Sequence, residues 1–133
     1  MAVNNPYKAY QQNSVTQSTP GELTLMLYNG CLKFLNQAKK GIETKNIELK
    51  NTNIQKAQNI LRELMVTLDM SIPISESIQA LYEYMINRLV EANIQNDSTV
   101  IDEIATYITD FRDTWKQVIQ INRQKQYGQP GVI

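Results

Sequence analysis

Residues 46–68 read NIELKNTNIQKAQNILRELMVTL, and this stretch decides the fold class. Its apolar residues recur three or four positions apart, as the 3.6-residue period of an amphipathic helix requires. The residues on this stripe are Ile54, Ala57, Leu61, Leu64, Met65 and Leu68. Because no Gly or Pro interrupts the pattern, we predict one long helix from about Asn46 to Leu68.

The same reasoning predicts three more long helices. The first begins at Thr19, whose hydroxyl can cap it, and runs to about Glu43. The third spans about residues 73–96. The fourth follows a turn at residues 96–98, and its apolar stripe consists of Ile101, Ile104, Ile108, Phe111, Trp115 and Val118. Short connections between such helices make consecutive helices antiparallel neighbours.

These elements predict an all-α fold with three parts. Residues 19–125 form an antiparallel up-down four-helix bundle, in which every residue of the last stripe, Trp115 included, belongs to the core. Residues 1–18 form a short N-terminal capping segment, and residues 126–133 form a flexible C-terminal tail.

The residue types exclude most catalytic chemistry. The 133-residue chain has no His and only one Cys, Cys31, which falls on an apolar stripe. Histidine-dependent catalysis, the common zinc sites and an internal disulfide framework are therefore excluded. The sequence also lacks the glycine-rich motifs that bind phosphate groups. We predict a protein that is not an enzyme and that holds no metal and no cofactor.

Charge and hydropathy narrow the choice of partners. Thirteen Lys and Arg residues balance thirteen Asp and Glu residues, which argues against a nucleic-acid partner. No run approaches the ~20 consecutive apolar residues of a membrane span, and the first residues lack the apolar run of a secretory signal. We expect a cytoplasmic protein with no membrane anchor.

The first predicted helix has more apolar surface than one bundle stripe needs. A second stripe lies beside the first and consists of Leu25, Tyr28, Leu32 and Leu35. The third helix has a weaker second stripe of Ile86, Val90 and Ile94. One interpretation is that the first helix is simply the most central helix. The other makes these stripes a binding surface, so that Asp in place of Leu32 or Leu35 would weaken binding more than folding.

The N-terminal segment could cover part of this apolar surplus. Tyr7 and Tyr10 lie three positions apart, with Ala9 between them, in an otherwise polar segment. This spacing brings two large amphipathic rings within one helical turn. We predict that Tyr7 and Tyr10 form a cap that packs back against the bundle.

Several stretches together carry a recognisable pattern. They are NPYKAYQQNSV (5–15), TPGELTLMLYNGCLKFL (19–35), NIQKAQNILRELMVTLD (53–69), LYEYMINRLVEANIQND (81–97) and FRDTWKQ (111–117). In this order they cover nearly the whole chain, and the combination resembles the flagellin export chaperone family (FliS), in particular its Bacillus-type members.

The resemblance implies a fold and a function. Members of this family are antiparallel helical bundles whose N-terminal segment folds against the bundle. They bind the disordered C-terminal segment of new flagellin, keep it from polymerising in the cytosol, and deliver it to the flagellar type III export gate. By this resemblance Tyr7 and Tyr10 belong to the capping segment, and the surface around Leu25, Tyr28, Leu32 and Leu35 is the candidate surface for the client, flagellin.

A second hypothesis, from another class, is a homo-oligomeric helical scaffold or adaptor protein. In it the surplus stripe pairs with a second copy, and the free protein is a homodimer. Light scattering with and without flagellin separates the two hypotheses, because a dimer that persists when flagellin binds favours the scaffold.

Overall fold

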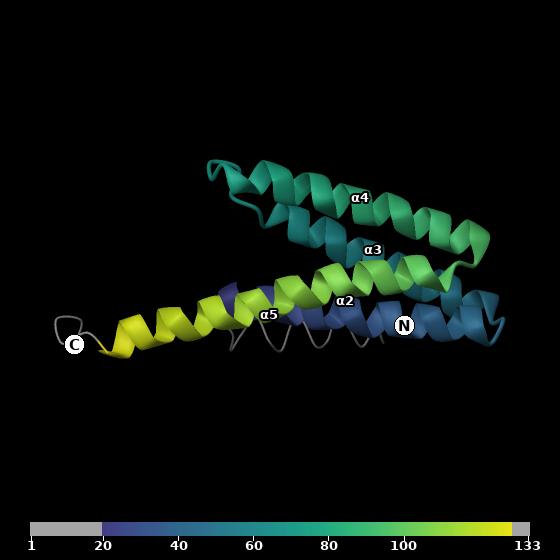
Figure 1. The fold of residues 1–133 in the computed structure, drawn as a ribbon, viewed down its shortest axis with the longest axis horizontal. Helices are drawn as coiled ribbons and strands as arrows, with labels where there is room; N and C mark the ends of the chain where they lie inside the picture. The colour runs from purple at the N-terminus through teal and green to yellow at the C-terminus, as the bar shows by residue number, and fades with distance from the viewer. Residues whose placement is uncertain (1–19, 129–133) are drawn as a thin grey trace, which may run out of the picture.

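The computed structural model describes residues 20–128, which form four helices connected by short turns (Figure 1). The helices are α2 (Pro20–Glu43), α3 (Ile47–Val66), α4 (Ile74–Gln95) and α5 (Ser98–Gly128). Consecutive helices run in opposite directions (Figure 1). The predicted all-α antiparallel bundle is therefore confirmed. Thr19 and the predicted capping segment lie outside the described residues.

The last helix is longer than predicted. It continues to Gly128, so the boundary placed between residues 125 and 126 falls inside α5. Residues 120–127 contain no Gly and no Pro, and their Gln, Lys and Arg residues favour a helix. Nothing in the local sequence therefore stops the helix before Gly128.

The turn between α2 and α3 depends on one glycine. A β-carbon at Gly41 would lie 2.5 Å from the backbone nitrogen of Lys50, so only glycine allows the two helices to approach this closely. Lys45 adopts a left-handed conformation, with φ of 59°. Asn46 then caps α3, because its side-chain oxygen accepts a hydrogen bond of 3.0 Å from the backbone N–H of Leu49.

The turn between α4 and α5 is closed by polar side chains. Asn96 ends α4 in the left-handed conformation, as a helix C-cap often does. The Asp97 carboxylate accepts hydrogen bonds from the backbone N–H and the hydroxyl of Thr99, at 3.0 and 2.6 Å. The predicted turn and cap at residues 96–98 are thus confirmed.

A buried lysine completes the end of α4, which has no basic residue in its own last turn. The Lys50 ammonium group, from α3, donates hydrogen bonds to the Asn93 carbonyl at 2.9 Å and to the Asn96 side chain at 2.5 Å. It therefore satisfies one of the backbone carbonyl groups that a helix end leaves without partners.

The core lies along the shared faces of the four helices. Its buried apolar residues include Leu27, Cys31, Phe34, Ala38, Ile54, Ala57, Leu61, Leu64, Met85, Leu89, Ile101, Ile104 and Ile108. Helix α2 packs closely against both α3 and α5. A helix with neighbours on two sides buries more than one stripe.

This central position buries two of the residues assigned to a binding surface. Leu35 is 0% exposed and Tyr28 is 6% exposed, so both pack in the core. Leu32 is half-buried and packs against the core edge. The interpretation of the first helix as the most central one therefore holds for Leu35, whereas Tyr28 packs against Tyr82 of α4 and Phe111 of α5.

The two helix pairs do not stay parallel along their length. In Figure 1 the α3–α4 pair and the α2–α5 pair lie close together where α4 passes into α5, and they separate toward the α3–α4 loop. In α5, the fully buried residues end at Ile108, whereas the apolar stripe continues to Phe111, Trp115 and Val118. Beyond Ile108, α5 thus carries apolar residues that are only partly buried at the edge of the core.

The core position of Leu35 predicts the effect of a charge. We expect Leu35→Asp to abolish the cooperative thermal transition or to lower its midpoint severely, because a buried, unpaired carboxylate is very costly. Leu32→Asp, one turn away and half-buried, is the control and should leave a folded bundle with a smaller loss. Calorimetric unfolding measures both, and a Leu35→Asp variant that melts like the unaltered chain would place Leu35 outside the core.

Candidate functional site

A large apolar groove lies where the two helix pairs separate. Its volume is about 890 Å³, and it is lined by the first turns of α2, the α3–α4 loop, the first half of α4 and the middle of α5. This volume lies near the upper end of the range that small-ligand pockets occupy.

Apolar side chains form most of the groove's walls. They are Leu23, Leu68, Ile72, Ile74, Ile78, Leu81, Phe111, Trp115 and Val118. Ile72 and Ile74 are also exposed to solvent at the edge of the groove. Contiguous exposed apolar surface of this kind marks a place where another apolar surface binds.

Three aromatic rings form the floor of the groove. The Phe111 ring stacks on Tyr28 with centroids 6.0 Å apart and planes 9° apart, and it lies 5.7 Å from the Tyr82 ring at a tilt of 49°. The Tyr28 and Tyr82 hydroxyls hydrogen-bond to each other at 2.9 Å. Burial raises the pKa of both phenols, so both hydroxyls remain protonated at neutral pH.

Trp115 lies in the wall of the groove, at the edge of the core. It is half-buried, and its indole Nε1–H donates a hydrogen bond of 2.7 Å to the Gly21 carbonyl. The expectation that Trp115 belongs to the core holds only in part, because the ring packs against the edge of the core and its other side lines the groove. The hydrogen bond holds the ring against the start of α2.

The residues assigned to a binding surface from the sequence lie in different places. Of the seven, Tyr28 alone lines the groove. Leu25, Leu32 and Ile86 are half-buried elsewhere, and Val90 and Ile94 are exposed on α4. Tyr7 and Tyr10 lie outside the described residues.

Most residues of the groove escaped the sequence analysis. The exposed isoleucines Ile72 of the α3–α4 loop and Ile74 of α4 were not assigned to any site, and Phe111, Trp115 and Val118 of α5 were assigned to the core. The last three were expected there, because they continue the stripe of Ile101, Ile104 and Ile108 at the same spacing. Nothing in that spacing separates the buried part of the stripe from the part that lines the groove.

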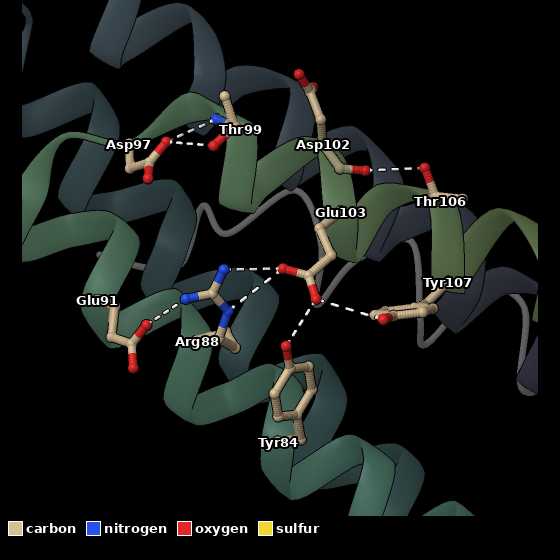
Figure 2. Close-up of polar contacts among 9 residues, drawn as sticks. All are labelled: Tyr84, Arg88, Glu91, Asp97, Thr99, Asp102, Glu103, Thr106 and Tyr107. Atoms are coloured by element: carbon tan, nitrogen blue, oxygen red, sulfur yellow. Dashed lines mark hydrogen bonds and ion pairs between the residues drawn. The ribbon is translucent and has the colours of Figure 1, made fainter.

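A polar cluster joins α4 to α5 beside the groove (Figure 2). The Glu103 carboxylate accepts hydrogen bonds from the Tyr84 hydroxyl at 2.7 Å and from the Tyr107 hydroxyl at 3.3 Å, and it pairs with Arg88 at 3.0 Å. Arg88 also pairs with Glu91 one turn along α4. The hydrogen bond from Tyr84 and the Arg88 guanidinium together hold the pKa of Glu103 below its ordinary value.

The described residues offer little for catalysis. Within residues 20–128, no group of His, Cys, Asp and Glu side chains is arranged to hold a metal ion. Complete burial raises the pKa of the Cys31 thiol to about 12, so it is not a nucleophile at neutral pH. Among the same residues, no helix has the length and apolar character needed to cross a membrane.

Comparison with known proteins identifies the family. The family model described as flagellar protein FliS matches residues 3–122. The chain belongs to the FliS family. It is 56% identical to the flagellar secretion chaperone FliS of Bacillus subtilis (strain 168) over 132 residues, which are 99% of each chain. The resemblance to Bacillus-type FliS proteins is therefore confirmed.

More distant FliS proteins are similar over most of the chain. The flagellar secretion chaperone FliSB of Pseudomonas aeruginosa is 36% identical over 81% of this chain and 90% of its own. FliS of Salmonella typhimurium is 32% identical over 84% and 87%. A solved structure described as a flagellar chaperone from bacteria shares the fold, with a TM-score of 0.71 and 20% identity over 86% of this chain and 95% of its own.

The Glu103 cluster predicts a pH-dependent contribution to stability. The pKa of Glu103 is lower in the folded protein than its ordinary value of 4.5. The ionised carboxylate therefore adds to the free energy of unfolding above pH 4.5, and this stabilisation is lost as the pH falls through the lower pKa of the folded protein. We expect Glu103→Gln to lower the melting temperature at pH 7, and the difference from the unaltered chain to shrink below pH 4.5. Thermal unfolding between pH 3 and pH 7 measures this.

Glu91→Gln is the matched control for this prediction. It removes the other carboxylate that pairs with Arg88, but that pair lies within α4 and joins no two helices. Its effect at pH 7 should be smaller. A difference between Glu103→Gln and the unaltered chain that stays constant down to pH 3 would contradict the assignment.

Proposed function

We propose that this FliS protein is a cytoplasmic, non-catalytic flagellar export chaperone that binds the C-terminal segment of flagellin in the groove. Binding keeps flagellin from polymerising early, and the loaded chaperone delivers it to the flagellar type III export apparatus. The observation that supports this proposal is the apolar groove of about 890 Å³ on a chain of the FliS family.

The shape and composition of the groove suit an amphipathic helix. Such a helix inserts apolar residues spaced three and four positions apart into an apolar groove. Here the groove is open along one side of α4 and α5, and its walls are supplied by aliphatic and aromatic residues such as Leu68, Ile78 and Val118. A disordered segment would fold as it binds, since only the bound state buries its apolar face.

The favourable free energy of such binding comes from the burial of apolar surface, and the loss of conformational entropy in the client segment opposes it. Coupled folding and binding typically buries on the order of 1,000–3,000 Å² and costs about 2–5 kcal/mol for ordering the segment. That area exceeds what one groove supplies, so we propose that the client extends beyond it. Leu25, Leu32, Ile86, Val90 and Ile94 are the candidates for this outer part of the footprint.

The proposed function has a direct test. Isothermal titration calorimetry compares full-length flagellin with flagellin that lacks its C-terminal segment. We expect only the full-length protein to bind, with a stoichiometry of one to one. Equal affinities for full-length flagellin and for flagellin without its C-terminal segment would contradict the proposal. Light scattering in the same mixtures distinguishes the chaperone from the scaffold hypothesis, because a homodimer that persists with flagellin bound would favour the scaffold.

A substitution at the edge of the groove tests its location. Ile74 lines the groove and is 60% exposed, so Ile74→Asp should fold normally and yet weaken flagellin binding by at least tenfold. Ile47→Asp is the matched control, since Ile47 is 67% exposed at the start of α3, outside the groove. We expect Ile47→Asp to bind normally, and equal losses in the two variants would place the client elsewhere.

The N-terminal tyrosines give a second prediction. We propose that Tyr7 and Tyr10 cover part of the apolar surface in the free protein and compete with flagellin for it. Replacing both with Ala should then lower the thermal stability and solubility of the free protein, while affinity for flagellin stays the same or rises. Calorimetric unfolding and titration measure these two effects. A loss of affinity with no change in stability would instead make the tyrosines direct client contacts.

A further inference from the structure

The hydroxyl pair in the floor of the groove has a donor left over. The Tyr28 and Tyr82 side chains are 6% and 2% exposed, and their hydroxyl oxygens lie 2.9 Å apart. Each phenol carries one O–H donor, and one hydrogen bond between them uses one of the two. Within residues 20–128 neither hydroxyl makes another hydrogen bond. One O–H group of the pair therefore has no acceptor among the described residues.

The other polar aromatic groups that line the groove are paired. The Tyr107 hydroxyl donates to Glu103, and the Trp115 indole N–H donates to the Gly21 carbonyl. A donor that borders the groove loses its contact with water when a client fills the groove, and that loss is unfavourable unless the client supplies an acceptor. The Tyr28–Tyr82 pair is thus a place in the aromatic floor where an acceptor supplied from outside would add a hydrogen bond.

The position of the pair makes the donor accessible from the groove. Tyr28 belongs to α2 and Tyr82 to α4, and the backbones of these two helices are not in contact over the described residues. The two long side chains therefore meet across the space between the helices, where both line the groove. The Phe111 ring packs against both rings and fixes their orientation, so the two hydroxyl oxygens are held in place before a ligand arrives.

We propose that the Tyr28–Tyr82 pair is a polar specificity point that donates a hydrogen bond to a neutral side-chain oxygen of the bound client helix. This inference rests on the proposed function and names the chemistry that the client must present. The acceptor is the carboxamide of Asn or Gln, or the hydroxyl of Ser or Thr, set within the apolar face of the helix. A carboxylate does not suit the position, because burying its charge among apolar side chains is costly.

The proposal explains how an apolar groove can discriminate between amphipathic helices. Apolar contacts alone tolerate many helices of similar size, because burial depends little on the identity of the side chains. A fixed donor rejects a helix that presents only apolar groups at this position, since the O–H group then stays unpaired when water is excluded.

The experiment is a titration of the flagellin C-terminal segment into the full chain. The Tyr28→Phe/Tyr82→Phe double variant keeps both rings and removes both hydroxyls, so it leaves no unpaired donor and should remain folded. We expect it to bind the segment roughly 3- to 10-fold more weakly. Tyr84→Phe is the matched control. Tyr84 lies on α4, as Tyr82 does, but its hydroxyl donates to Glu103 of α5 and it does not line the groove. Its affinity should be unchanged.

A second measurement identifies the acceptor and holds even if the double variant loses stability. Each Asn, Gln, Ser and Thr of the segment is replaced in turn by an apolar residue of similar size, and every segment is titrated into both the unaltered chain and the double variant. At one position the replacement should cost 3- to 10-fold in affinity with the unaltered chain and nothing with the double variant.

The outcomes separate this inference from the proposed function. Suppose that the unaltered chain and the double variant bind the segment equally well, and that each replacement in the segment changes both affinities by the same factor. The hydrogen bond from the tyrosine pair is then wrong, and the groove proposal stands. If the unaltered chain does not bind the segment at all, the proposed function and this inference both fail.

Discussion

The packing of α2 between α3 and α5 is the contact on which the rest of the structure depends. It buries Leu35 completely and Tyr28 nearly so, and it makes α2 the central element of the bundle. The close approach to α3 requires glycine at position 41, where a β-carbon would collide with the backbone of Lys50. Helix α4 packs against α3 and α5, but over the described residues its backbone does not contact that of α2. The space between α4 and the first turns of α2 is the groove.

The two ends of the bundle differ for physical reasons. At the closed end, Lys50 caps α4, Asp97 caps the start of α5, and Arg88 and Glu103 join the two helices. At the other end the helix pairs separate, as Figure 1 shows, and no comparable polar contact joins α4 to α5 within the described residues. Aromatic side chains bridge the gap there instead, and their outer surfaces form the groove. A stable closed end thus supports an open, apolar end.

The groove combines apolar contact with one fixed hydrogen-bond donor. The apolar side chains supply most of the area that a binding helix can bury, and burial drives association without requiring a particular sequence. The Tyr28–Tyr82 pair adds direction, because a hydrogen bond demands an acceptor at a defined position.

The sequence by itself determined the secondary structure, the antiparallel order of the helices and the family. Apolar spacing, caps and the scarcity of Gly and Pro are local properties, and they defined α3 and α4 to within two residues. The end of α5 was placed three residues too early. The helix in fact continues to Gly128, the next glycine or proline in the chain. The sequence also showed that the first helix has an apolar surplus, but it left open whether a neighbouring helix or a client covers that surplus.

Only the tertiary structure decided which apolar residues are covered. Leu35 and Trp115 lie on helical stripes of similar appearance, yet Leu35 is buried and Trp115 lines the groove. The difference arises from the separation of the two helix pairs, which depends on side-chain packing between residues far apart in the chain. Periodicity reports which face of a helix is apolar, whereas burial depends on where the neighbouring helices end. The sequence therefore defined the faces, and the packing of the four helices decided which of them remained available for binding.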